Sequence, residues 1–137
     1  MRLNKRLQSL GEYINDSFFK GELDFVAVYS MNLNKKKNRK IFAKWYNYKH
    51  RKKIEKCANC FYGVSSFDYG IILNSYHNPK GSLREYGTLI HEYIHQWQDL
   101  HDLDDDKDIH GYWFTRKAFE IGEEMGWSDK QTREYII

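Results

Sequence analysis

The chain has 137 residues, a formal net charge of +3, 41% hydrophobic residues and 17% aromatic residues. This length suits one compact domain, and the apolar content exceeds that of disordered chains, which bury too little surface to offset their conformational entropy. One proline and two cysteines exclude collagen-like, proline-rich and disulfide-dense secreted scaffolds. We therefore expect a single domain over residues 1–137.

The N-terminus carries no recognisable export signal. Residues 1–6 are basic, but polar residues interrupt the segment where a signal peptide would be apolar. The longest apolar run, residues 25–29, is too short to cross a bilayer. We expect an intracellular protein, cytoplasmic or nucleoid-associated, that is monomeric, makes no membrane contact and keeps its cysteines reduced.

The first half of the chain predicts one helix followed by strands. Apolar residues recur at steps of three or four over residues 3–18, which indicates an amphipathic helix, and Gly21 is placed to end it. Four further segments have the apolar or aromatic content of strands: residues 25–29, a strand or hairpin around 41–48, residues 61–64 and residues 69–73.

The second half predicts two helices separated by an acidic loop. Ser82 can cap a helix that runs to about His101, and residues 102–108 lack the spacing of a calcium loop, so they are expected to be an exposed loop. The last helix starts near residues 110–111. Four of its residues are expected to face the core: Trp113, Phe114, Phe119 and Ile121.

These elements predict the α+β class. A small antiparallel or mixed sheet is expected to pack against the N-terminal helix, the long helix after Ser82 and the C-terminal helix.

Residues 91–95 read His-Glu-Tyr-Ile-His, a His-Glu-x-x-His pattern within the long helix. At about 100° per residue, His91 and His95 lie roughly 40° apart, so both imidazoles can reach one ion. Glu92 falls on the same side, where it can reach a metal-bound water. Five residues are a weak signal alone, but this pattern lies beside a separate apolar stripe and is followed by further histidines. The sequence therefore predicts a zinc site with Glu92 as catalytic base.

The third ligand has three candidates. His110 follows a loop long enough to return the chain, and Gly111 permits close approach. A carboxylate of the last helix is the second candidate, and His101 is the third. His101 has the spacing of a His-x-x-Gly-x-x-His extension, but Gln98 replaces the glycine and a continuing helix would point His101 away. The carboxylates are Glu120, Glu123 and Glu124.

Two segments resemble the SprT-like metalloproteases, relatives of Spartan. These are residues 87–95, Gly-Thr-Leu-Ile-His-Glu-Tyr-Ile-His, and residues 110–114, His-Gly-Tyr-Trp-Phe; residues 13–23 and 71–74 resemble the family's opening helix and the strand before its metal helix. The likeness covers about residues 7–125. It implies a metal helix packed on a small sheet and cleavage of proteins at or near DNA.

By this resemblance the zinc ligands would be His91, His95 and His110, with Glu92 as the catalytic glutamate. Two departures leave the substrate open. Gln96 stands where the family commonly has a small residue, and the chain has no trailing four-cysteine zinc ribbon.

Residues 35–56 hold eleven Lys and Arg against a single Glu, so the rest of the chain is net acidic. This asymmetry indicates a nucleic-acid surface, and the interleaved aromatic rings favour single-stranded DNA. The alternative is a solvated hairpin whose aromatic side joins the core. The expected contact residues are Lys35, Lys36, Lys37, Arg39, Lys40, Lys44, Trp45, Arg51, Lys52 and Lys53.

Cys57 and Cys60 have the spacing of half a zinc knuckle, which only His50 or His77 could extend. Because a structural site needs four ligands, two small, partly buried thiols at a strand turn are the preferred interpretation.

The sequence thus predicts a zinc metalloendopeptidase that binds one catalytic Zn²⁺ and acts on protein substrates. Two alternatives stay open: a DNA-binding protein with a purely structural zinc, and a zinc amidohydrolase acting on a non-protein amide such as a cell-wall peptide.

Overall fold

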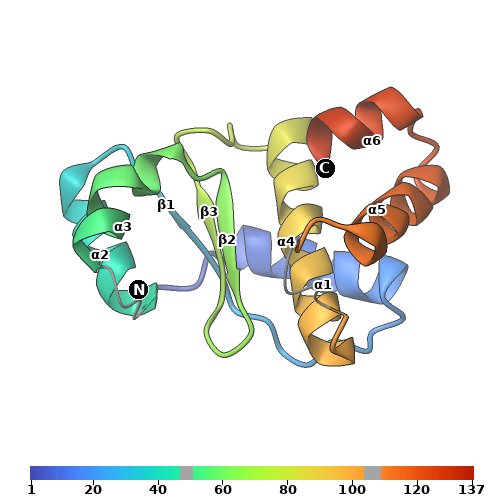
Figure 1. Cartoon of the computed structure of the whole chain (residues 1–137), viewed down its shortest axis with the longest axis horizontal. Helices are drawn as coiled ribbons and strands as arrows, with labels where there is room; N and C mark the ends of the chain where they lie inside the picture. The colour runs from blue at the N-terminus through green and yellow to red at the C-terminus, as the bar shows by residue number, and fades with distance from the viewer. Residues whose placement is uncertain (47–50, 104–108) are drawn as a thin grey trace.

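The computed structural model describes residues 1–46, 51–103 and 109–137 (Figure 1). The helices are α1 (Lys5–Phe18), α2 (Lys36–Tyr46), α3 (Arg51–Cys57), the 3₁₀ turn η1 (Ala58–Cys60), α4 (Leu83–His101), α5 (Tyr112–Glu124) and α6 (Asp129–Tyr135). The strands are β1 (Val28–Met31), β2 (Gly63–Ser66) and β3 (Gly70–Asn74). Across the described ranges, no helix combines the length and the apolar character that a bilayer crossing requires.

The three strands form one mixed sheet in the order β1-β3-β2. β1 runs parallel to β3, with Val28 opposite Ile71, and β2 runs antiparallel to β3, with Gly63 opposite Leu73. β2 is therefore an edge strand, connected to β3 by a tight turn. Six helices around a small mixed sheet confirm the α+β class.

The sheet separates two hydrophobic clusters, because successive side chains of a strand point to opposite faces. Ile71 and Leu73 of β3 join the larger cluster with α1, α4 and α5, whereas Ile72 between them joins a smaller cluster with α2 and α3. Figure 1 shows the resulting layers, with α2 and α3 on one side of the sheet and α4 on the other. The fold is a helix–sheet–helix arrangement.

The N-terminus of α4 is held by its cap and by an ion pair. Ser82 caps the helix as predicted, since its side chain accepts a hydrogen bond from the Glu85 backbone N–H at 3.1 Å. The buried Glu85 carboxylate accepts two bonds from the Arg6 guanidinium, both 2.7 Å long, which ties α4 to α1. The helix that carries the His-Glu-x-x-His pattern is thus anchored about two turns before it.

The predicted strand or hairpin around residues 41–48 is wrong. Residues 36–46 form α2, and residues 47–48 lie outside the described residues. Phe42 and Ala43 are buried, and Tyr46 stacks on Phe42 with ring centroids 5.7 Å apart, so the apolar face follows a helical period. The aromatic content suggested a strand, but burial of this face against the sheet favours the helix.

Three smaller differences concern the start of a strand, the burial of side chains in α5 and a helix that was not predicted. The strand predicted at residues 25–29 begins at Val28, and Phe25 is 71% exposed. In α5, Phe114 and Ile121 are buried as predicted, Phe119 is half-buried and Trp113 is exposed. Helix α6 was not predicted, although Ser128 and Gln131 form a capping box at its start. Most of the predicted acidic loop, residues 104–108, lies outside the described residues.

Candidate metal centre

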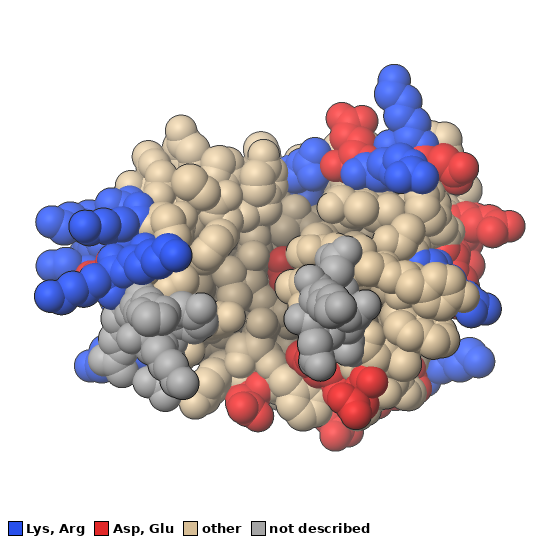
Figure 2. Space-filling view, in the orientation of Figure 1, with Lys and Arg blue, Asp and Glu red and all other residues tan. Residues whose placement is uncertain are grey.

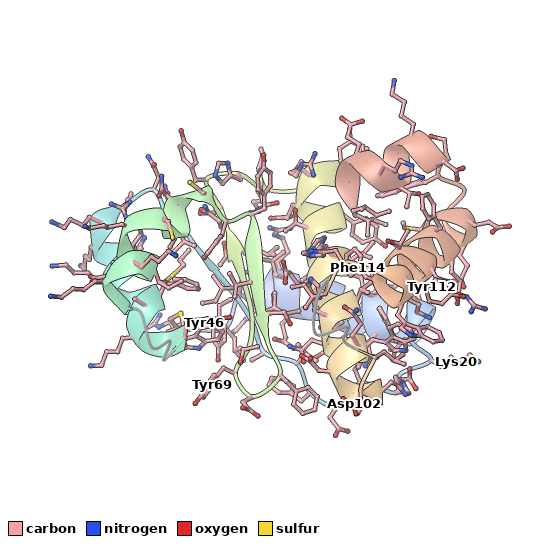
Figure 3. The ribbon with its side chains drawn as sticks, viewed as in Figure 1. Lys20, Tyr46, Tyr69, Asp102, Tyr112 and Phe114 are labelled. Carbon is pink, nitrogen blue, oxygen red and sulfur yellow. The ribbon has the colours of Figure 1, made fainter. Side chains whose placement is uncertain are left out.

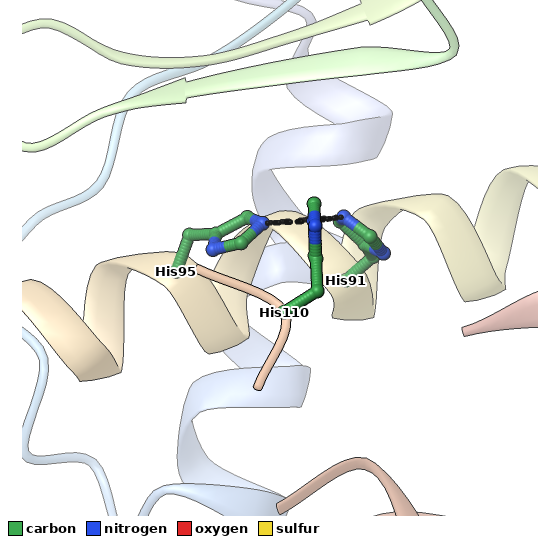
Figure 4. Close-up of side chains that lie close together, drawn as sticks. All are labelled: His91, His95 and His110. Carbon is green, nitrogen blue, oxygen red and sulfur yellow. Dashed lines mark hydrogen bonds between the residues drawn. The ribbon is translucent and has the colours of Figure 1, made fainter. Parts of the chain in front are cut away.

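Three imidazoles converge on one point in front of α4 (Figure 4). His91 and His95 lie one turn apart on α4, and His110 comes from the segment that precedes α5. Their Nε2 atoms are 3.2 Å apart between His91 and His95, and 3.1 Å from each of these to His110. Within the described ranges, this trio is the group of side chains whose geometry could hold a metal ion.

The triangle of nitrogens has the size that a tetrahedral zinc site requires. Zinc–nitrogen bonds of about 2.0–2.1 Å at tetrahedral angles place two ligand nitrogens about 3.3 Å apart. The observed separations of 3.1–3.2 Å are close to this value. The three residues therefore fit one zinc ion through Nε2 with little rearrangement.

The outer nitrogens of two rings set the protonation of the inner ones. His91 Nδ1 lies 2.5 Å from the Ile136 carbonyl oxygen, and His95 Nδ1 lies 2.9 Å from Gln98 Oε1. Both oxygens can only accept, so each Nδ1 carries the proton and each Nε2 presents a lone pair. Two lone pairs 3.2 Å apart cannot bond to one another, and a proton on His110 Nε2 could serve only one of them. A cation between the rings satisfies all three nitrogens.

Gln98 connects the two parts of the site. Its side chain is 1% exposed, and while its Oε1 accepts from His95 its Nε2 donates to the Ile109 carbonyl at 3.0 Å. One buried amide thus orients a helix histidine and holds the backbone next to His110. Such outer contacts orient metal-binding imidazoles and increase their basicity.

Burial keeps the two helix histidines neutral. It lowers the pKa of His91 to about 3, assisted by the neighbouring rings of His95 and His110 and opposed by the Ile136 carbonyl. It also lowers the pKa of His95 to about 4, assisted by His110 and opposed by Gln98. Neutral imidazole is the form that binds metal.

The rings rest on an apolar floor. Phe114 is fully buried, and its ring centroid lies 4.7 Å from that of His91, 5.0 Å from that of His95 and 4.9 Å from that of His110. Figure 3 shows Phe114 between α4 and α5. The phenyl ring excludes water from beneath the three imidazoles and limits their rotation.

Glu92 is a buried carboxylate beside this centre. The residue is 5% exposed, and its Oε1 lies 4.0 Å from His91 Nε2. Burial raises the pKa of Glu92 to about 8. A carboxyl group with a near-neutral pKa can both accept and return a proton.

The position of Glu92 depends on the absence of a side chain at Gly63 in β2. A Cβ at Gly63 would lie 3.1 Å from both Cγ and Oε1 of Glu92. The glycine therefore leaves room for the carboxylate between α4 and the edge strand.

A cavity of about 490 Å³ opens beside Glu92 and the metal centre. One wall is formed by residues 60–63, which lead into β2, and the opposite wall by residues 133–137 at the end of the chain. The floor is the face of α4 that carries Arg84, Thr88 and His91. Figure 2 shows a hollow between the two halves of the molecule on this side.

The other candidates for a third ligand lie elsewhere. His101 is exposed and its Nε2 lies 3.0 Å from Glu22 Oε1, while Glu120 pairs with Lys117 at 3.3 Å. Neither these residues nor Glu123 and Glu124 belong to the converging group in the described part of the chain. Of the residues considered from the sequence, the structure brings His110 to His91 and His95.

The basic segment covers the opposite end of the molecule. Figure 2 shows Lys and Arg side chains gathered over α2 and α3, across the sheet from α4. Arg39 donates to the backbone carbonyls of Leu33, Asn34 and Glu55, so part of its role is structural. The Arg51 side chain lies outside the described residues. Seven of the expected contact residues have exposed side chains: Lys35, Lys36, Lys37, Lys40, Lys44, Lys52 and Lys53.

The aromatic residues of this segment belong mainly to the smaller core. Trp45 is half-buried, and its ring centroid lies 6.0 Å from that of Tyr29 and 5.8 Å from that of Tyr69. Figure 3 shows Tyr46 and Tyr69 at this end of the molecule. The arrangement favours the alternative in which the aromatic side packs inward, and leaves lysines as the main exposed groups.

The cysteine pair does not form part of a metal cluster within the described ranges. Cys57 is half-buried and Cys60 is exposed, and both are free thiols. His77 Nε2 donates to the Asn59 carbonyl oxygen at 2.8 Å, so this nitrogen is protonated and is not a ligand atom. His50 lies outside the described residues.

Sequence reasoning missed three residues that shape the site. Gln98 contacts His95, Gly63 lies beside Glu92, and the Ile136 carbonyl contacts His91. The approach of Gly63 and Ile136 to the site arises only in the fold. Gln98 carried one readable signal, since it is a polar residue three positions after His95 on a helix. Gln96 was noted as a departure, and it donates to Ser65 Oγ and the Ser66 carbonyl, each at 2.8 Å, which joins α4 to β2.

Comparisons of the chain with protein-family models, curated proteins and solved structures find no match. A function for the chain therefore rests on the chemistry of the site.

Proposed function

We propose that the chain is a zinc-dependent endopeptidase of the SprT-like type. The observation that carries the proposal is the convergence of three histidine Nε2 atoms beside a buried carboxylate with a near-neutral pKa. The resemblance of residues 87–95 and 110–114 to that family supports the same reading, because it assigns the ligand and base roles to the same four side chains.

The donor set favours zinc. Three neutral imidazoles on a tetrahedral triangle suit Zn²⁺, which binds nitrogen readily and has no octahedral preference. When bound, zinc would polarise a water molecule and the carbonyl oxygen of the scissile bond. His91, His95 and His110 would hold the ion, and Phe114 would shield it from below.

Glu92 supplies the proton transfers in this proposal. Its carboxylate would take a proton from the attacking water and return it to the amine that leaves. Burial raises the pKa of Glu92 to about 8 without a zinc ion, and a nearby cation would lower it toward the ionised form that acts as base. Because the side chain lies 4.0 Å from His91 Nε2, it is beside the centre rather than a member of the converging triangle.

A purely structural zinc is less well supported. Structural sites have four protein ligands and no open position, whereas three side chains converge here among the described residues. Two of the three histidines, His91 and His110, also line a cavity of about 490 Å³. Both features favour a catalytic ion.

The shape of the cleft favours a peptide substrate over a non-protein amide. β2 is an edge strand beside the cleft, and among the described strands it pairs only with β3. An extended peptide can add to such an edge through main-chain hydrogen bonds. This would lay a scissile carbonyl along the line from Gly63 to His91.

A second candidate function, binding of single-stranded DNA, is favoured by the lysines over α2 and α3. This surface lies across the sheet from the metal centre, so DNA bound there would recruit the enzyme to proteins on DNA and would not enter the cleft. Binding would be mainly electrostatic, since the aromatic rings are largely packed inward.

The decisive experiment measures metal content and peptide cleavage on the same preparations. The wild type should bind one zinc per chain and cleave casein. Glu92→Gln should keep the metal and lose cleavage, and His91→Ala should lose both. Glu123→Gln, an exposed residue on α5, is the matched control and should retain both properties. A fully active Glu92→Gln variant would refute the assigned role, and wild type that binds no zinc would refute the proposal.

A further inference from the structure

We propose that Arg84 is a specificity residue of the cleft, which selects peptides with a carboxylate about three residues from the scissile bond. The inference rests on the proposed peptidase function and adds a substrate class to it. It is carried by the position of Arg84 in the cavity, by the two aromatic rings that hold it and by the absence of an acidic partner among the described residues.

Two tyrosines from opposite walls of the cleft hold the Arg84 guanidinium. Its Cζ lies 5.5 Å from the ring centroid of Tyr62, which precedes β2, and 5.2 Å from that of Tyr135 at the end of α6. Such stacking fixes the plane of the guanidinium while leaving its N–H groups able to donate. The cation is therefore held in place on the floor of the cleft before a substrate arrives.

The charge of Arg84 is not used by the fold. Among the described residues no carboxylate lies within ion-pair distance of its guanidinium, whereas Arg6, the other arginine near the start of α4, is paired twice with Glu85. The other charged groups that line the cavity are Glu92, Arg133 and Glu134. Arg133 is turned toward α5, with its Cζ 4.9 Å from the ring centroid of Phe119.

A carboxylate is the natural partner of a preorganised guanidinium, because its two oxygens can accept two parallel N–H···O bonds from the planar group. Arg84 precedes His91 by seven residues, which is about 10 Å along the helix axis. An extended peptide advances about 3.3 Å per residue, so this distance corresponds to about three residues. The carboxylate can come from an Asp or Glu side chain, or from the C-terminus of the substrate.

The test uses the zinc-loaded full chain and three pools of synthetic decapeptides. The first pool contains Asp and Glu, the second replaces them with Asn and Gln, and the third matches the second but has amidated C-termini. Mass spectrometry locates the cleaved bonds. For the wild type we expect at least about tenfold enrichment of an acidic side chain or a free C-terminus at one fixed position, about three residues from the cleaved bond.

The variants separate recognition from stability. Arg84→Gln should reduce the ratio of cleavage with and without the recognised carboxylate to near one, and Arg84→Lys should leave an intermediate ratio, because it keeps the charge without the planar guanidinium. Arg116→Gln is the matched control, since Arg116 also lies over aromatic rings, those of Tyr112 and Trp113, but outside the cavity lining. It should retain the wild-type ratio, and thermal unfolding verifies that each variant is folded.

The outcomes distinguish this inference from the proposed function. Cleavage of all three pools at equal rates by the wild type would overturn the inference and leave the peptidase proposal standing. An unchanged ratio in folded Arg84→Gln would also overturn it. If zinc-loaded wild type cleaves no peptide of any pool, the proposed function fails and the inference fails with it. Enrichment confined to free C-termini, or to acidic side chains, identifies the source of the carboxylate.

Discussion

Replacing Glu92 by Gln in the metal-free protein tests the burial of this carboxylate directly. Burial raises the pKa of Glu92 from 4.5 to about 8, so the folded protein keeps a proton that the unfolded chain releases between these values. The contribution of Glu92 to the free energy of unfolding of the wild type is therefore greatest below pH 4.5. This contribution is lost as the pH rises toward 8. The loss is about 1.4 kcal/mol per pH unit, or about 4 kcal/mol at pH 7.5.

Glutamine has a similar shape and does not ionise, so Glu92→Gln should remove this loss. We expect the free energy of unfolding of the metal-free variant to exceed that of the wild type by up to about 4 kcal/mol at pH 7.5 and by almost nothing at pH 4. For a chain of this size the difference at pH 7.5 corresponds to a rise in Tm of about 10 °C or more. The assay is thermal or urea unfolding in a strong chelator across this pH range, because a bound cation would itself lower the pKa of Glu92.

Glu85→Gln is the matched control, because Glu85 lies on the same helix and is equally buried, at 5% exposed. Its carboxylate accepts from Arg6 and from the Gly81 backbone N–H, so the same substitution should destabilise the protein by about 1–2 kcal/mol at pH 7.5. Equal stability of Glu92→Gln and wild type at pH 7.5, or an equal gain at pH 4, would refute the reasoning.

Three further variants test other parts of the structure. Gln98→Leu removes the acceptor of His95 Nδ1 and should weaken zinc binding by about 10–100-fold in a chelator competition; unchanged affinity would mean that this amide does not orient the ring. Gly63→Ala should displace the Glu92 carboxylate by a few tenths of an ångström and reduce kcat by roughly tenfold with zinc content unchanged, and a variant with normal kcat would contradict the assigned contact. Lys52→Glu should weaken single-stranded DNA binding and reduce its salt dependence; wild-type affinity that stays flat between low and physiological salt would exclude phosphate contacts.

The parts of the fold that were predictable are those with a strong local signal. The helix after Ser82 combines a cap, a helical apolar period and sufficient length, and the structure has it from Leu83 to His101. Helix α2 carries a comparable period in Phe42, Ala43 and Tyr46, but its aromatic residues have high β-propensity and suggested a strand. Burial against the second face of the sheet, which no local pattern reveals, decides this conflict in favour of the helix.

The candidate site divides in the same way. The approach of His91 to His95 follows from the geometry of one helix turn, so spacing alone predicts it. The arrival of His110 requires the chain to return across α4, and the residues left it as one of three candidates. The contacts of Gln98 with Ile109 and of His91 with the Ile136 carbonyl depend on segments that meet only in the folded chain. These contacts carry no sequence signature, since both of them use a backbone carbonyl oxygen.

The last residues of the chain lie against the three-histidine centre, where the Ile136 carbonyl accepts a hydrogen bond from His91 and Ile137 lines the cavity. Figure 1 shows Met1 in the opposite half, beyond the sheet. A purification handle fused after Ile137 would emerge at the mouth of the cleft, next to the carbonyl that holds His91. Expression vectors for this protein should carry their tags ahead of Met1.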